Sequence, residues 1–126
     1  MHPPSQKVKR DLAERTFNYA RMILSLYSHL PKTTPMQILG RQLLKSGTSV
    51  GANYREAERA RSKPEFISIA GVSLRELHES QYWLALIASE SPDLAGKVQP
   101  VANETDELCA IFSTLVKNAK RTPSLD

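Results

Sequence analysis

Apolar residues recur along most of this chain with the period of an α-helix, and polar breaks divide the pattern into four segments. At about 100° of rotation per residue, each segment places its apolar residues in one stripe, as a helix of an antiparallel bundle does. The segments cover residues 9–29, 35–61 and 63–89 and, after a turn at 91–93, a last stretch that ends near 121. No segment has the alternating pattern of a β-strand. The pattern therefore predicts an all-α, antiparallel up-down-up-down four-helix bundle.

The two central segments show the clearest stripes, and the break Ser62-Lys63-Pro64 separates them. Ser62 is a predicted N-cap, because serine followed by proline and glutamate is typical of a helix start. Thr34 is the predicted N-cap of the preceding helix, with Pro35 in its first turn. The predicted buried positions are Met36, Leu39, Leu43, Gly47, Val50, Tyr54 and Ala57 before the break, and Phe66, Ala70, Ser73, Leu77, Ser80, Leu84 and Ile87 after it.

The first and last segments are less regular. One stripe of the first segment consists of Leu12, Tyr19, Ile23, Leu26 and Leu30, and a second of Phe17, Ala20, Leu24 and Tyr27. We therefore expect this helix to contact more than one neighbour. The last segment contains Pro100, which lacks an amide hydrogen, so the helix either starts near this residue after a separate turn or bends there. Its predicted buried positions are Leu108, Ile111, Phe112, Leu115, Val116 and Ala119.

The length of 126 residues corresponds to a single domain. We expect residues 1–8 to be disordered, residues 9–121 to form the bundle, and residues 122–126 to be a frayed tail. The basic N-terminus lacks the apolar centre of a signal peptide, and no stretch is apolar enough to cross a membrane. The one cysteine, Cys109, excludes an internal disulfide, which is typical of a reducing compartment. A soluble, cytoplasmic protein is the expectation.

Positive charge is concentrated in the first half of the chain. Residues 1–63 contain 12 Lys/Arg and 4 Asp/Glu, whereas residues 64–126 contain 5 and 9. The candidate basic face, which lies opposite the buried stripes on a helical projection, comprises Arg10, Arg21, Arg41, Lys45, Arg55 and Arg59. These cations either attract the acidic half of the chain or bind a polyanion. No aromatic residue interrupts the row on the second segment, so a nucleic acid would be held by its phosphates, with little regard to sequence.

The third segment carries more apolar surface than one bundle helix buries. Beside its main stripe lies a second strip that also contains two acids: Ile69, Val72, Glu76, Glu79, Trp83 and Leu86. Because a four-helix bundle buries one face of each helix, the second strip predicts a homo-oligomer or the docking of a protein partner. The alternative is that Trp83 only covers the edge of the bundle.

Three carboxylates and one amide are candidate polar sites. Glu56, Glu76 and Glu79 could transfer protons, because paired acids near apolar residues can act in acid–base catalysis. Residues 55–61 supply three arginines, and we interpret the carboxylates as partners of these arginines in structural ion pairs across a helix interface. Asn53, within an apolar helix face, is expected to set the helix register by hydrogen bonding.

No motif of an enzyme or a metal site is found. A di-iron bundle requires Glu-x-x-His on two helices, but the residues three positions before His29 and His78 are Leu26 and Arg75. The scattered histidines and single cysteine do not form a zinc pattern, and G-x-S-x-G, P-loop and Rossmann patterns are absent. Cys109 lies in an apolar run and is expected to be a core residue rather than a catalytic thiol. We therefore predict no catalytic residue, no metal and no cofactor.

A longer pattern resembles a known family. Residues 46–57 (SGTSVGANYREA), 60–63 (ARSK) and 66–67 (FI), followed in register by 74–80 (LRELHES) and 82–84 (YWL), are similar to the signature of the 23S rRNA intervening-sequence proteins, a family of small four-helix bundles. The resemblance implies a homopentamer with a central channel. It also implies a relationship to the accessory variability determinant of diversity-generating retroelements, which works beside a reverse transcriptase and turns a basic surface toward nucleic acid.

Two functions from different classes follow. The first is a non-enzymatic, oligomeric helical-bundle protein that binds the backbone of RNA or DNA through its basic face, as an accessory factor. The alternative is a structural adaptor or protein-interaction scaffold without a nucleic-acid role, in which the arginines pair with Glu56, Glu76 or Glu79 of a neighbouring subunit. The expected partners are further copies of the chain and either RNA, DNA or a protein, with no membrane.

Overall fold

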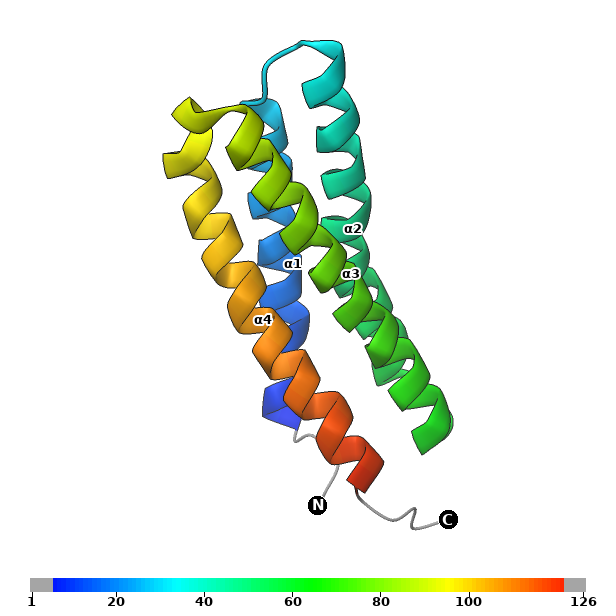
Figure 1. The fold of residues 1–126 in the computed structure, drawn as a ribbon. Coiled ribbons are helices and arrows are strands. Elements are labelled where there is room, and N and C mark those ends of the chain that lie inside the picture. The colour runs from blue at the N-terminus through cyan, green and yellow to red at the C-terminus, as the bar shows by residue number, and fades with distance from the viewer. Residues whose placement is uncertain (1–5, 122–126) are drawn as a thin grey trace.

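The computed structural model describes the backbone of residues 6–121 and the side chains of residues 11–121. These residues form α1 (Gln6–Ser28), α2 (Thr34–Glu58), α3 (Lys63–Glu90) and α4 (Ala95–Arg121), with a 3-10 turn, η1 (Pro92–Leu94), between α3 and α4. Consecutive helices run in opposite directions and lie side by side (Figure 1). The described residues contain no strand, and the prediction of an all-α four-helix fold is confirmed.

The helices do not pack equally closely. The most extensive contacts join α2 to α3, those of α3 with α4 and of α1 with α2 follow, and the sparsest join α1 to α4. The approach of α1 to α2 depends on glycine: a Cβ added at Gly47 would lie 2.6 Å from Ile23 Cγ1, and one at Gly40 would lie 2.6 Å from Leu30 Cδ1. Among the described helices, none is both long and apolar enough to span a membrane.

The predicted stripes form the core with few exceptions. The main stripe of α1 is buried along its whole length, as are most predicted positions of the other helices. Five positions predicted to be buried are only half-buried: Leu39, Phe66, Ile111, Leu115 and Ala119. On the second apolar strip of α1, Phe17 and Leu24 are exposed, whereas Ala20 and Tyr27 are half-buried. Helix α1 contacts α2 and, more sparsely, α4, as expected, but these contacts leave Phe17 and Leu24 uncovered.

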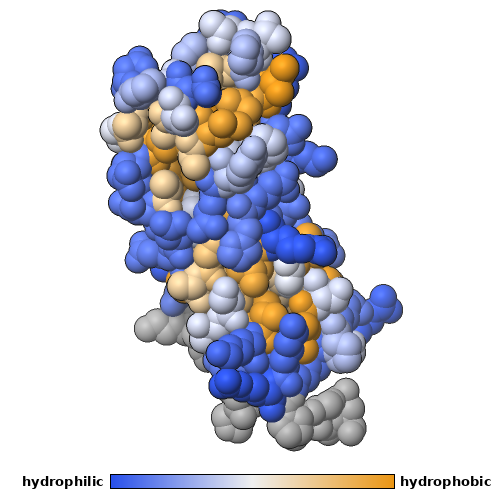
Figure 2. Space-filling model, viewed as in Figure 1, coloured by the Kyte–Doolittle hydropathy of each residue, from blue (hydrophilic) through white to orange (hydrophobic). Residues whose placement is uncertain are grey.

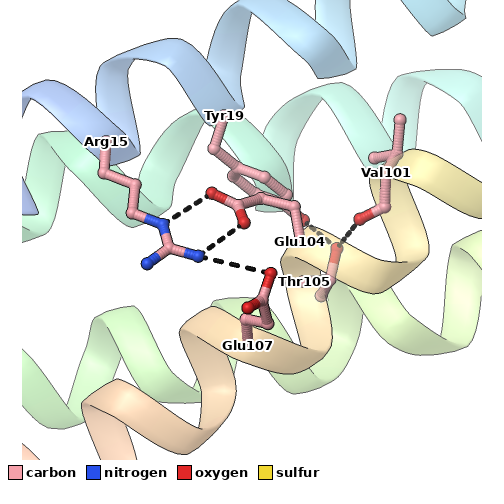
Figure 3. Close-up of polar contacts among 6 residues, drawn as sticks. All are labelled: Arg15, Tyr19, Val101, Glu104, Thr105 and Glu107. Carbon is pink, nitrogen blue, oxygen red and sulfur yellow. Dashed lines mark hydrogen bonds and ion pairs between the residues drawn. The ribbon is translucent and has the colours of Figure 1, made fainter.

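A layer of buried hydroxyl groups crosses the middle of the bundle. The Tyr19 hydroxyl of α1 lies 2.7 Å from Thr105 Oγ1 of α4, and Ser46 Oγ of α2 lies 2.7 Å from Ser80 Oγ of α3. Thr105 Oγ1 donates its own hydrogen to the Val101 carbonyl, so the Tyr19 hydroxyl is the donor to Thr105 (Figure 3). All four side chains are at most 1% exposed. Each helix thus contributes one hydroxyl, and the pairs favour a single relative height of the helices.

The two predicted N-caps have different outcomes. Ser62 caps α3, and its Oγ accepts a hydrogen bond from the Glu65 amide at 3.2 Å, as predicted. The prediction of Thr34 for α2 is wrong, because the N-cap is Thr33 and Thr34 is already helical. Thr33 has the extended backbone of a cap but makes no side-chain cap hydrogen bond. Of these two helices, only α3 starts with a side-chain cap hydrogen bond.

The N-terminal helix is longer than predicted. It begins at Gln6, before the expected start at Lys9, because Gln, Lys and Val can extend the first turn without a break. Residues 6–8 are thus helical rather than disordered. Residues 1–5 and the tail 122–126 lie outside the described residues, together with the predictions of disorder and fraying that concern them.

The other helix ends also differ from the predictions. Helix α2 ends at Glu58 rather than near Arg61, because the chain turns before the extended N-cap of α3. Helix α4 begins at Ala95 and continues through Pro100, so a start near the proline is wrong. The missing amide of Pro100 leaves the Gly96 carbonyl without a helical donor, and both residues are exposed, where water can donate instead.

Candidate functional site

The predicted basic row lies on the solvent side of α2. Arg41, Lys45, Arg55 and Arg59 are all exposed, because α2 buries its opposite side against α1 and α3. From the first to the last of these residues the row extends about 27 Å, at 1.5 Å per residue. Within the described side chains, no ion pair joins the row to an acid. The four cations therefore face solvent with their charge available to a ligand.

Helix α1 places a further predicted cation beside this row. Arg21 is exposed, and Ile23, two residues later, packs against Gly47 of α2. Arg21 therefore lies at the height of the middle of the row. Arg10 belongs to the first turns of α1, but its side chain lies outside the described part of the chain.

The fold brings more cations to one end of the bundle. The first turns of α1, the connection from α2 to α3 and the last turn of α4 meet at this end (Figure 1). A small apolar cluster of Ala57, Ala70 and Val116 holds α2, α3 and α4 together there. Residues 55–65 and 117–121 contain seven Lys/Arg and three Glu. The exposed cations of this basic end are Arg55, Arg59, Arg61, Lys117, Lys120 and Arg121.

The opposite end of the bundle is electrically balanced. Residues 27–40 and 86–99 contain two lysines against Glu90 and Asp93. The charge asymmetry therefore runs between the two ends of the bundle as well as between the halves of the chain. Sequence analysis did not include residues 117–121 in the basic face. The sequence contained the information needed, because in an up-down-up-down bundle the second and fourth helices finish at the same end.

The ion pairs of the described side chains belong to Arg15, a residue that sequence analysis did not select. Arg15 Nε and Nη2 each donate to one oxygen of Glu104 at 2.8 Å, and Nη2 lies 3.4 Å from Glu107 Oε2. Both carboxylates turn toward the guanidinium (Figure 3). The hydrogen bond to Glu104 is the main reason that the pKa of Arg15 is raised. This pair bridges the sparse α1–α4 contact, so Arg15 is not part of the basic face.

The predicted second strip of α3 lies at the surface and consists mainly of half-buried apolar side chains. Its members Ile69, Val72, Glu76, Trp83 and Leu86 are half-buried, and Glu79 is exposed. Trp83 Nε1 donates to Glu79 Oε1 at 3.3 Å, and the ring of Tyr82, 61% exposed, meets the Trp83 ring edge to face at 5.0 Å between centroids. Figure 2 shows hydrophobic side chains gathered over the C-terminal half of α3 on this face.

The two acids of this strip do not form the predicted structural ion pairs. Burial and the neighbouring Glu79 raise the pKa of Glu76, while Lys45 and Arg75 act in the opposite direction. Within the described side chains, neither these acids nor Glu56 pairs with an arginine of residues 55–61. Arg55 lies next to the α1-facing side of α2, whereas Glu76 and Glu79 belong to α3, on the other flank of α2.

Asn53 bonds within its own helix rather than across an interface. Its Nδ2 donates to the Ser49 carbonyl of α2 at 2.8 Å. The register bond expected of it is made by others, since Ser73 Oγ of α3 donates to the Val50 carbonyl at 2.9 Å and Ser46 pairs with Ser80. Small hydroxyl side chains reach across the close α2–α3 contact because they sit on the buried stripes.

A shallow groove between α1 and α4 has a cavity volume of about 260 Å³. Its lining consists of Met22, Ser25, Leu26, His29, Lys97 and Val101. The lining contains no carboxylate, so Glu76 and Glu79 are not part of this groove. The groove also lies at the balanced end, away from the basic end.

Cys109 is buried in the core, as predicted. Its Sγ lies 3.9 Å from His78 Nδ1. Burial, with a smaller contribution from the charge of Asp106, raises the pKa of this thiol to about 11, so the nucleophilic thiolate is disfavoured. In the part of the chain that the structure describes, no three His, Cys, Asp or Glu residues are grouped so as to hold a metal ion.

The four-helix fold agrees with the comparisons with known proteins. No curated protein matches the chain. Among solved structures, the chain is similar to a protein with unknown function from the S23 ribosomal protein family of Bacteroides thetaiotaomicron, with 30% identity and a TM-score of 0.78. The match covers 84% of this chain and 98% of that one. Residues 9–114 match the 23S rRNA-intervening sequence proteins as a family, and the chain therefore belongs to that family.

Proposed function

We propose that this protein binds the sugar–phosphate backbone of nucleic acid, without catalysing a reaction, through the exposed cations of α2 and the adjoining basic end. The observation that supports this function best is that Arg41, Lys45, Arg55 and Arg59 are exposed along one side of α2, and none forms an ion pair within the described side chains. Nucleic acids present regularly spaced negative charge, which such a row complements over several phosphates.

The expected binding is electrostatic and nearly independent of base sequence. Lysine and arginine side chains that contact phosphates set orientation but carry no sequence information. If the four cations of the row each neutralise one phosphate, the logarithm of the binding constant falls with the logarithm of salt concentration with a slope of about −4 on duplex DNA.

Fluorescence anisotropy with a labelled duplex DNA and a structured RNA, from about 50 to 300 mM salt, tests this function. The double variant Arg55→Gln/Arg59→Gln should weaken binding about tenfold at low salt and reduce the slope by about 2. The matched control, Arg75→Gln/Lys97→Gln, removes two exposed charges outside the basic face and the basic end and should change the affinity less than twofold. No binding of the unmodified protein at micromolar concentration in low salt would overturn the proposal.

A second function, a protein-interaction scaffold, is favoured by the α3 strip. Aromatic side chains are enriched at the centres of protein interfaces. The exposed Tyr82 and the half-buried Trp83 form an aromatic pair on a half-buried apolar surface. We propose that copies of the chain associate through this strip into the homopentamer that the sequence resemblance implies. Light scattering should then give about five times the 14.1 kDa of one chain.

One set of variants separates the two functions. Val72→Asp, which puts a charge into the strip, should lower the mass measured by light scattering, because an unpaired charge in an apolar interface is strongly unfavourable. Arg55→Gln/Arg59→Gln should leave the mass unchanged while it weakens nucleic-acid binding. If the arginine variant also dissociates the assembly, these cations belong to a subunit interface and the scaffold is the better description.

A further inference from the structure

The packing of the bundle does not explain why two large apolar side chains of α1 are exposed. Phe17 is 55% exposed and Leu24 is 53% exposed. They are two helical turns apart and therefore lie on the same side of α1. Most side chains with this exposure on the described surface are polar or charged, so this pair requires an explanation of its own.

The contacts of α1 place Phe17 beside the cations of α2. Thr16 packs against Gly51, where its Oγ1 would lie 3.0 Å from an added Cβ. Phe17 follows directly in the chain, and Arg55 lies one turn beyond Gly51 on the same side of α2. The exposed ring of Phe17 and the exposed Arg55 thus border the same α1–α2 surface.

Leu24 is placed in the same way as Phe17, farther along the α1–α2 surface. Ile23 packs against Gly47, and Leu24 follows it, so the Leu24 side chain borders α2 farther toward Arg41. Arg21 is exposed between Phe17 and Leu24 on α1. Cations and large apolar side chains therefore alternate on this surface. The expectation that no aromatic residue accompanies the basic row holds for α2 alone, because the aromatic residue comes from α1.

We infer that this α1–α2 surface binds single-stranded nucleic acid more tightly than duplex, with an unpaired base stacked on Phe17 and the neighbouring phosphates on Arg21 and Arg55. The inference rests on the proposed function and names the class of ligand. Proteins that hold single strands combine a positively charged track with aromatic rings on which bases stack. In a duplex the base faces are covered by their neighbours, so Phe17 would have nothing to stack on and only the phosphates would be held.

The test compares three single variants on two probes of known length, an oligothymidylate and a fully paired DNA hairpin, by fluorescence anisotropy at low salt. Phe17→Ala should weaken binding of oligothymidylate about tenfold, the effect typical of losing one stacked base, and leave hairpin binding within about twofold. Leu24→Ala is the matched control, because Leu24 is equally exposed on the same surface but has no aromatic face. Phe17→Trp should keep the affinity for oligothymidylate.

The outcomes separate this inference from the function on which it rests. Binding of both probes that is indifferent to Phe17→Ala would overturn the stacking inference and leave backbone binding intact. Binding of neither probe would overturn the proposed function itself. If Phe17→Ala and Leu24→Ala weaken binding equally and both lower the mass measured by light scattering, the surface is a contact between subunits and the inference is wrong.

Discussion

Two tyrosines at the centre of the bundle provide the sharpest test of the core. Both Tyr19 and Tyr54 are 0% exposed, but only one has a partner for its hydroxyl. Tyr19 donates to Thr105 Oγ1 at 2.7 Å. The Tyr54 hydroxyl has no hydrogen-bond partner among the residues that the structure describes, and its ring meets the Phe112 ring edge to face at 5.6 Å between centroids. The same change, tyrosine to phenylalanine, should therefore have different effects at the two positions.

The expected sizes follow from these contacts. Tyr19→Phe removes a buried hydrogen bond and leaves Thr105 without its donor, which should lower the free energy of unfolding by about 1–2 kcal/mol. Tyr54→Phe removes a hydroxyl that lost its hydration on folding and gained no hydrogen bond. That variant should be unchanged or more stable by up to about 1 kcal/mol.

Urea denaturation followed by circular dichroism measures both variants, at one protein concentration so that any self-association affects them equally. The midpoint should fall for Tyr19→Phe and stay level or rise for Tyr54→Phe. An equal loss in the two variants would refute the reasoning, because it would mean that the Tyr54 hydroxyl has a partner such as an ordered water.

The stability of the protein at alkaline pH tests the burial of the same two tyrosines. Desolvation raises the pKa of Tyr19 to about 12 and also raises that of Tyr54. An unfolded tyrosine ionises near pH 10, so the folded state binds these protons more tightly than the unfolded chain does. The stabilisation is complete below about pH 10 and is lost as the pH rises toward 12. The urea midpoint should therefore fall over this range, less steeply in Tyr54→Phe, and a flat profile would contradict the burial.

Two further pairs of variants test the helix contacts and caps by the same denaturation assay. Gly47→Ala should lower the free energy of unfolding by about 1–3 kcal/mol, because its Cβ would lie 2.6 Å from Ile23 Cγ1. Gly71→Ala meets nothing within 4 Å and should raise it by up to about 1 kcal/mol; the reverse order would contradict the close approach of α1 and α2. Ser62→Ala should cost about 1 kcal/mol and Thr33→Ala less, because only Ser62 makes a side-chain cap bond. Equal losses at the two caps would be inconsistent with this difference.

The fold was predictable because the sequence of each helix contains the apolar spacing that identifies it. The spacing of buried residues such as Leu43, Val50 and Leu77 determines which side of a helix faces inward, and this side is correct in the structure. Helix boundaries were less accurate where no strong cap is present. Ser62 was identified from its own segment, whereas Thr33 and Thr34 offer the same side chain at adjacent positions.

The candidate site was predictable only one helix at a time. A helical projection places Arg41 and Arg55 opposite the core but does not say which neighbouring helix lies beside them. Phe17 was assigned to a second apolar strip that was expected to contact a further neighbour, and only the packing of α1 in the structure shows that its side chain is exposed. The pairing of Arg15 with Glu104 joins residues 89 positions apart, and no local pattern in the sequence indicates it.

The basic end has a consequence for any ring built from this chain. A cyclic symmetry operation cannot invert a protomer, so if the helices run along the rotation axis, every copy presents this end to the same side of the ring. One rim would then hold Arg61, Lys117 and Lys120 from every subunit, and the other rim would be close to neutral. Such a ring would carry net positive charge on only one of its two rims. A long polyanion could engage several subunits of that rim at once and bind with an avidity that a short oligonucleotide cannot match.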